Sequence, residues 1–229
     1  MAGWASRTQR RDRAGTSAFS LAVAALVLAT LAAWLILLAA SGDSMEVPGA
    51  ATYLGSWTVM MAAMMLPSVA PFALLYARGA PNAVAPGFLA AGYLGVWALV
   101  GIPAYALDRT LGMEHPRATA AVLIFAGLYQ LSPLKDTCLR RCRTPADFLV
   151  QHWHPGLGGA LRLGAEHGMF CIGCCIGLMA VLVIAGGMGL VWVAAIALVV
   201  AAEKLLPFGR LIALAGGVGL IAAGVVVAL

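Results

Sequence analysis

Runs of about twenty apolar residues without a charge recur along this chain, and no other feature limits its fold as strongly. The first run covers residues 19–40 and contains no Asp, Glu, Lys or Arg. Because about 20 residues of helix are needed to cross the ~30 Å hydrocarbon core of a bilayer, such a run predicts a membrane-spanning helix. A mean hydropathy of +0.95 and a charged fraction of 10%, against about 25% in soluble domains, exclude a water-soluble fold.

Several further segments share this apolar character. We expect helices over residues 19–40, 53–76, 87–107, 118–131, 161–184, 190–202 and 211–229. The first run is longer than the 7–15-residue apolar core of a signal peptide, so it is interpreted as a membrane helix. The fourth is the shortest. The sequence therefore predicts an all-α polytopic transmembrane helical bundle of about seven helices, or six if the fourth does not span.

The domain organisation predicted from this pattern is simple. A basic segment at residues 1–17 precedes a single transmembrane domain at residues 18–229, and a polar loop with Cys and His lies at residues 132–160. The chain is too short to hold a second folded domain besides about seven spans.

The distribution of Lys and Arg predicts the orientation of the chain. Basic residues gather in the N-terminal segment, at Arg78, from Lys135 to Arg143 and from Lys204 to Arg210. In a seven-helix chain all four places lie on one side, which the positive-inside rule makes cytoplasmic. We therefore expect a multi-pass protein of the bacterial inner membrane with a cytoplasmic N-terminus and an outside C-terminus. Everything after the fourth segment inverts if that segment does not span.

The basic excess does not indicate nucleic acid. The 14 Lys and Arg outnumber 9 Asp and Glu, but they lie in short loops between apolar segments. In that place they act as a topology signal or attract anionic lipid. The lipid bilayer is therefore the expected partner, and nucleic acid is not.

One apolar helix concentrates side chains that bind metals. At 100° per residue, His167, Cys171, Cys174 and Cys175 fall within an arc of about 100°, with Met179 at its edge. Residues one helical turn apart can direct two sulfurs at one ion. Thiolate and thioether select Cu(I), and imidazole would also suit Zn(II). The stretch predicts a copper site, with zinc as the alternative ion and plain packing as the alternative role.

The second predicted helix adds a methionine quartet. Met60, Met61, Met64 and Met65 follow Trp57, and three of them share one face near the expected bilayer midplane. They could complete a sulfur site with the cysteines. Because methionine is also a flexible filler of cores, packing is the alternative.

A third cluster lies in the polar loop. Cys138 and Cys142 are spaced to share a helical face, and nearby arginines favour the thiolate. His152 and His154 alternate, so both would point the same way in an extended segment. The cluster predicts an uptake or relay site at the membrane surface. A disulfide or inert thiols are the alternatives for the two cysteines.

The pair Glu203 and Lys204 precedes Pro207 at the end of the sixth segment. We expect these two residues to form an ion pair at the membrane boundary with no further role.

These motifs resemble a family of bacterial integral membrane proteins predicted to bind metal. The resemblance rests on Met61-Ala-Ala-Met64-Met65-Leu-Pro67, on Tyr129-Gln-Leu-Ser-Pro133-Leu-Lys135 with Cys138 and Cys142-Arg143-Thr-Pro145, on Gly168-Met-Phe-Cys171-Ile-Gly-Cys174-Cys175 with Leu178-Met179, and on Glu203-Lys204. The blocks occur in the family's order over residues 50–207. Gly177 and Gly189 depart from the bulkier residues expected there, which leaves the packing near the site open.

The resemblance implies a copper-handling membrane protein similar to a copper chaperone. The matching positions that it carries over are Cys171, Cys174, Cys175, Met61, Met64, Met65, Cys138 and Cys142. It does not distinguish transport, delivery and storage.

Three functions remain open from the sequence. The leading hypothesis is a Cu(I)-handling bundle, not itself an enzyme, that moves the ion or inserts it into a copper-dependent membrane or extracytoplasmic enzyme. Its path would run from the Cys138 and His152 region to Cys171 and Cys175, then to Met60 and Met64. The second is a thiol-disulfide redox protein, and the third is an assembly subunit whose cysteines only pack.

Overall fold

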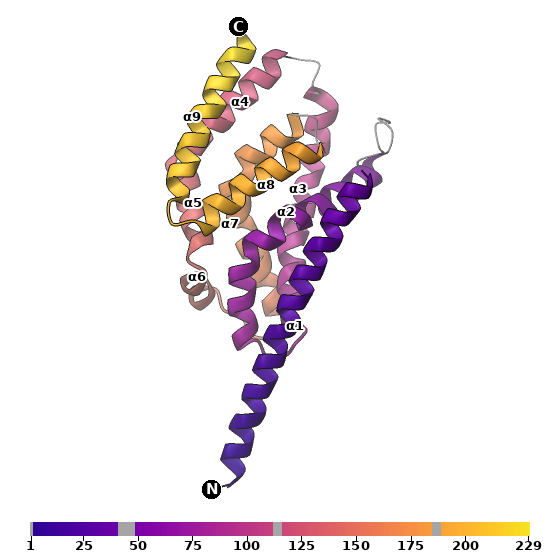
Figure 1. Cartoon of the computed structure of the whole chain (residues 1–229), viewed down its shortest axis with the longest axis vertical. Helices are drawn as coiled ribbons and strands as arrows, with labels where there is room; N and C mark the ends of the chain where they lie inside the picture. Colours follow the sequence, from indigo (N-terminus) through magenta and orange to yellow (C-terminus); the bar gives the residue numbers. More distant parts are fainter. Residues whose placement is uncertain (1, 41–48, 112–115, 185–188) are drawn as a thin grey trace.

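The protein is all-helical wherever its structure is described. A computed structural model describes residues 2–40, 49–111, 116–184 and 189–229, and no strand occurs in these ranges (Figure 1). The helices are α1 (Ala2–Ala40), α2 (Ala50–Gly79), α3 (Ala85–Leu111), α4 (Pro116–Gln130), α5 (Pro133–Arg143), α6 (Pro145–Gln151), α7 (Gly156–Ile184), α8 (Leu190–Leu205) and α9 (Gly209–Ala228). The predicted all-α class is confirmed.

The number of membrane-crossing helices differs from the expected seven. By length and composition, α1, α2, α3, α7 and α9 can each cross a membrane, which gives five spans in the described residues. The fourth predicted segment is the 15-residue α4, which is bent by 61° against α5, and the two together can make a sixth span. The predicted sixth helix is α8, which has 16 residues and falls short of the ~20 that a full crossing needs.

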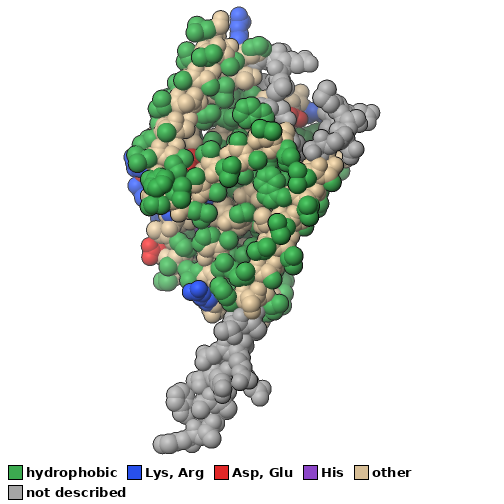
Figure 2. All heavy atoms as spheres, in the orientation of Figure 1, with side chains coloured by type: hydrophobic (Ala, Val, Ile, Leu, Met, Phe, Trp, Pro, Cys, Tyr) green, Lys and Arg blue, Asp and Glu red, His purple; other side chains and the backbone are tan. Residues whose placement is uncertain are grey.

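The two helices that carry most of the candidate ligands form the interior. In their most apolar windows, 56% of α2 and 61% of α7 is buried, against 11% for α1 and 17% for α9. Leucines of α1 such as Leu28 and Leu35 stay exposed, and hydrophobic side chains cover most of the face seen in Figure 2. An apolar exterior around a packed interior is the arrangement expected for a bundle in lipid.

The polar segment is folded, and not the loop that the sequence predicted over residues 132–160. Ser132 caps the N-terminus of α5, since its hydroxyl oxygen accepts a hydrogen bond from the Lys135 amide at 3.2 Å. Pro133 and Pro145 stand in the first turns of α5 and α6, where the missing N–H costs nothing. Of these two short helices, α5 carries both Cys138 and Cys142, and both pack against the hydrophobic core of the bundle.

The basic N-terminal segment is also part of a helix. Residues 2–17 continue directly into the first apolar run, so α1 is a single helix of 39 residues. The glycine-rich break predicted at residues 185–189 falls mostly on residues 185–188, which lie outside the described part of the chain. The helices on either side, α7 and α8, end and begin where the break predicts.

Glycines bring α3 and α7 into close contact. A side chain at Gly92 would overlap the carbonyl of Leu161, and one at Gly164 would overlap the carbonyl of Leu89. Small residues at such contacts let the backbones of two membrane helices approach each other. This contact fixes α7, the helix with the three neighbouring cysteines, against α3.

Candidate metal centre

Three thiols of α7 meet inside the bundle. Cys171, Cys174 and Cys175 are all buried, and their sulfurs lie within 4.8 Å of one another. The Cys174 and Cys175 sulfurs are 3.4 Å apart. The spacing i, i+3, i+4 places them on one face of the helix, as the sequence predicted. Thiols converging in this way form a ligand set suited to a soft cation such as Cu(I).

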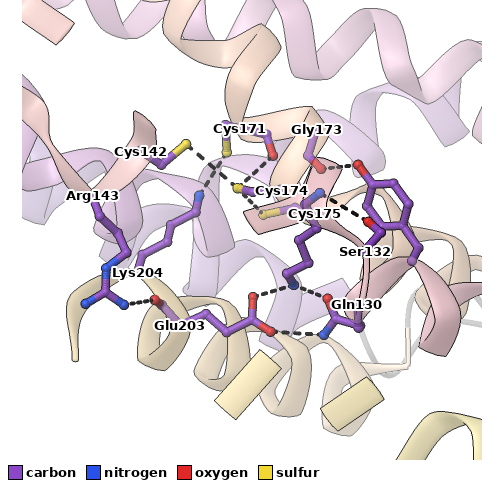
Figure 3. Close-up of polar contacts among 12 residues, drawn as sticks. Gln130, Ser132, Cys142, Arg143, Cys171, Gly173, Cys174, Cys175, Glu203 and Lys204 are labelled. Carbon is purple, nitrogen blue, oxygen red and sulfur yellow. Dashed lines mark hydrogen bonds and ion pairs between the residues drawn. The ribbon is translucent and has the colours of Figure 1, made fainter. Parts of the chain in front are cut away.

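A fourth thiol reaches this cluster from α5. The Cys142 sulfur lies 3.8 Å from that of Cys174, and Cys142 is only partly buried (Figure 3). Cys138, the other cysteine of α5, points instead at the backbone of Gly173, where an added Cβ would lie 2.5 Å from its sulfur. The two cysteines predicted to act together therefore have different neighbours. Cys142 is thus the partly buried thiol that lies beside the buried cluster.

Polar groups from two other helices contact the sulfur of Cys171. The Lys204 ammonium of α8 donates a hydrogen bond to it at 2.9 Å, and the Tyr93 hydroxyl of α3 also lies at 2.9 Å. The Met65 thioether of α2 is 4.0 Å away. Since an ammonium can only donate, this sulfur acts as an acceptor, which suits a thiolate.

The expected ion pair between Glu203 and Lys204 is wrong. The two side chains leave α8 in different directions, Lys204 towards Cys171 and Glu203 towards Gln130 (Figure 3). Glu203 pairs with Lys135 of α5 at 2.7 Å and accepts a hydrogen bond from Gln130 at 3.0 Å, and Lys135 also donates to Gln130. Adjacent helical residues project about 100° apart, so each of the two finds its own partner.

Contacts with the corner between α8 and α9 hold both ends of α5. In its first turn, Asp136 pairs with Arg210 at 2.6 Å, and Lys135 pairs with Glu203. In its last turn, Arg143 donates to the carbonyls of Glu203 at 2.8 Å and of Pro207 at 3.1 Å. These contacts keep Cys142 beside the cluster of α7.

His167 is buried one helical turn before Cys171. Its ring stacks on Phe72 with centroids 4.2 Å apart and meets the Phe148 ring edge-on at 5.0 Å. Among the described residues, no hydrogen-bond partner meets its Nδ1. A buried nitrogen without a partner is costly, and a ligand would relieve that cost. His167 therefore stays a candidate ligand, although it does not belong to the group of Cys171, Cys174 and Cys175 whose sulfurs converge.

The methionines are buried, but the structure distinguishes them. Met65 is the neighbour of Cys171 described above, whereas no hydrogen bond within the described residues links the other candidates to the cysteines. These others are Met60, Met61, Met64 and Met179, which lie in the hydrophobic core.

His152 and His154 make different direct contacts but both stand near the Glu166 carboxylate, and their role as an entry site stays a prediction. His152 ends α6 and stacks on Phe148 with centroids 4.2 Å apart, and its Nδ1 lies 3.1 Å from the carbonyl of Phe148. His154 instead lies 3.7 Å from Glu166. Because the chain leaves helical geometry between them, the two rings have different partners.

Sequence reasoning missed Lys204, Tyr93 and Ser68 as neighbours of the thiols. Ser68 accepts a hydrogen bond from the Lys204 ammonium at 3.2 Å. For Lys204 a signal was present, because an ionisable residue at the end of an apolar helix is by default a candidate functional residue. For Tyr93 and Ser68 no such signal exists, since both residue types are common in membrane helices.

The fold and this cluster define a class: a helical bundle of membrane type with a buried thiol site for a soft metal. The chain belongs to the copper chaperone family PpoB2, whose family model matches residues 54–227. No curated protein and no solved structure matches the chain. The family confirms the resemblance seen in the motifs, and with the cluster of Cys171, Cys174 and Cys175 it supports copper binding.

Proposed function

We propose that the protein is a membrane-embedded Cu(I) chaperone that holds the ion at the thiols of α7 and passes it to an acceptor. One observation carries this proposal: three buried thiols lie within 4.8 Å of one another in a chain of the copper chaperone family. Thiolates in an apolar, water-poor site bind Cu(I) in preference to harder cations. The role expected of such a protein is carriage, with no bond of a substrate made or broken.

Ligand exchange would move the ion. The partly buried Cys142 lies 3.8 Å from Cys174, so an ion held by Cys142 can gain a second sulfur before it leaves the first. Inside the bundle, Met65 offers a weaker thioether 4.0 Å from Cys171. This route differs from the path that the sequence suggested at both ends. Its outer sulfur is Cys142 in place of Cys138, and its inner thioether is Met65 in place of Met60 and Met64.

The acceptor of this proposal is a copper-dependent enzyme in the membrane or outside the cytoplasm. The protein itself would lie in the bacterial inner membrane with its N-terminus in the cytoplasm, as the basic residues indicate.

Metal analysis of the purified protein tests the proposal. The wild-type chain, prepared in detergent under reducing conditions and loaded with Cu(I), should retain copper in a fixed ratio. Cys171→Ser combined with Cys174→Ser should remove that copper, because both sulfurs belong to the buried cluster. Cys138→Ser is the matched control, since this thiol packs on Gly173 outside the cluster. Full copper content in the double variant would show that the site is wrongly assigned.

The contact between Cys142 and Cys174 favours a second candidate function, thiol-disulfide exchange. Sulfurs 3.8 Å apart on two helices need only a small movement to form a disulfide. Under this alternative, a Cys174→Ser variant would be trapped through Cys142 in a mixed disulfide with a partner protein. The wild-type protein would then purify without metal. Copper retained by reduced protein would decide against it.

A further inference from the structure

Lys204 is a buried cation beside the proposed copper ligands. Its side chain extends from α8 to the sulfur of Cys171 at 2.9 Å and to the hydroxyl oxygen of Ser68 at 3.2 Å (Figure 3). The residue is 8% exposed. A buried ammonium is stable only when an opposite charge compensates it.

No carboxylate fills that role among the described contacts of Lys204. Glu203, its neighbour in sequence, is paired with Lys135 at 2.7 Å, so those two charges cancel each other. Ser68 carries no charge, and its hydroxyl donates to the carbonyl of Met65 at 2.9 Å. The groups near the ammonium that can become negative are the thiols of α7 and the Tyr93 hydroxyl, and among them the Cys171 thiol accepts its hydrogen bond.

The charge of a loaded site follows from simple addition. Two thiolates and one Cu(I) make a complex with a net charge of −1, which burial in an apolar bundle would strongly disfavour. The ammonium of Lys204 brings the sum to zero. A doubly charged ion on the same two thiolates would leave a net charge of +1 with Lys204 in place.

We infer that Lys204 is the counter-cation of the loaded thiol site and shifts the preference of that site towards a singly charged ion. The inference rests on the proposed function and deepens it, because it assigns the preference to a residue that is not a ligand. Lys204 acts through the charge that it places beside Cys171, and it is in this sense a positioning residue.

Two ions with the same coordination but different charge test this inference. Ag(I) and Hg(II) both favour two-coordinate thiolate complexes, and they carry one and two positive charges. Removal of the ammonium favours the doubly charged ion over the singly charged one, whatever number of thiolates binds, because Coulomb energy scales with the charge of the ion. If Lys204 had a purely structural role, its replacement would weaken the binding of both ions to the same extent.

The experiment offers equimolar Ag(I) and Hg(II) to the reduced full-length protein in detergent and measures both metals by elemental analysis. Lys204→Gln, which removes the charge and adds no sulfur ligand, should lower the bound Ag-to-Hg ratio about tenfold or more. Lys204→Arg keeps the charge and should retain the wild-type ratio within about twofold. The amide of Lys204→Gln can still donate to Ser68, and if this variant does not fold, Lys204→Leu replaces it, because it too carries neither charge nor sulfur.

The outcomes separate the inference from the function on which it rests. An unchanged Ag-to-Hg ratio in the uncharged variant, or an equal fall of this ratio in Lys204→Arg, overturns the role of Lys204. In that case, binding of Ag(I) by the wild-type protein leaves the chaperone proposal intact. A wild-type protein that binds neither Cu(I) nor Ag(I) contradicts the proposed function itself.

Discussion

At the residue scale, the buried thiols differ in what surrounds them. Cys171 faces polar groups, the Tyr93 hydroxyl and the Lys204 ammonium, each at 2.9 Å. Cys174 faces other sulfurs, Cys175 at 3.4 Å and Cys142 at 3.8 Å. The polar groups around Cys171 can stabilise its sulfur as a thiolate. The sulfurs around Cys174 suit it to exchange a metal ion with Cys142.

The exchange role of Cys142 gives the first prediction. Cys142→Ser removes the partly buried sulfur next to Cys174, so loading and release of Cu(I) should slow about tenfold, equal to about 1.4 kcal/mol in the barrier. The amount of copper bound at equilibrium should change little. Stopped-flow transfer of copper to a chromophoric chelator measures the rate, with Cys138→Ser as the control. Equal slowing in both variants would contradict the distinction between the two cysteines.

How far the residues of the site follow from the sequence depends on whether one helix contains them. Cys171, Cys174 and Cys175 lie on α7, so helical periodicity alone places them on one face. The choice between Cys142 and Cys138 depends on how α5 is rotated against α7, and that rotation is a tertiary property. The partner of Lys204 likewise depends on tertiary structure. Because Glu203 forms its ion pair with Lys135 of α5, it does not pair with its neighbour Lys204.

At the scale of elements, the contacts at the two ends of α5 determine where Cys142 lies. Lys135 and Glu203 are each 1% exposed, so either one alone would be a buried charge without a partner. This contact and the hydrogen bonds of Arg143 join α5 to the α8–α9 corner. The polar residues of α5 thus position a sulfur beside the cluster of α7.

The second prediction concerns this buried pair. Lys135→Met should destabilise the protein by about 3–5 kcal/mol, because it leaves the Glu203 carboxylate buried and unpaired. Adding Glu203→Gln should recover part of the loss, since the unpaired charge disappears. Unfolding midpoints of the single and double variants in detergent measure the coupling. Losses that simply add would show that the two residues act independently.

The third prediction concerns the contact between α3 and α7. Gly92→Ala introduces a Cβ into the carbonyl of Leu161, so the two helices should separate and the unfolding temperature should fall. Gly95→Ala on the same helix meets nothing within 4 Å and should leave that temperature unchanged. Copper retention should fall with stability in the first variant. A Gly92→Ala protein as stable as the control would contradict the close contact.

At the scale of the whole molecule, the described helices form a bundle in which α2 and α7 are enclosed and α1 and α9 are largely exposed. The two chain ends lie at opposite ends of its long axis (Figure 1). The side of the membrane that each end faces stays a prediction. The number of spans was harder to predict from the sequence. A hydropathy pattern does not reveal the bend between α4 and α5, and it does not distinguish the short α8 from a helix that crosses the membrane.

The fourth prediction follows from this arrangement. Reporter domains fused to the two ends of the chain should be found on opposite sides of the membrane, the N-terminal one in the cytoplasm. Enzymatic reporters that are active on one side only make the measurement in intact cells. Both reporters active on the same side would mean that the α4–α5 or α8–α9 region crosses differently.

The central claim is that the buried thiols hold the copper, and X-ray absorption at the copper edge tests it most directly. For reduced, Cu(I)-loaded wild-type protein, the spectrum should show Cu(I) with sulfur as the dominant neighbour, as Cys171, Cys174 and Cys175 imply. In Cys171→Ser with Cys174→Ser, this sulfur shell should be lost together with the metal. A wild-type spectrum made up only of nitrogen and oxygen neighbours would contradict the account.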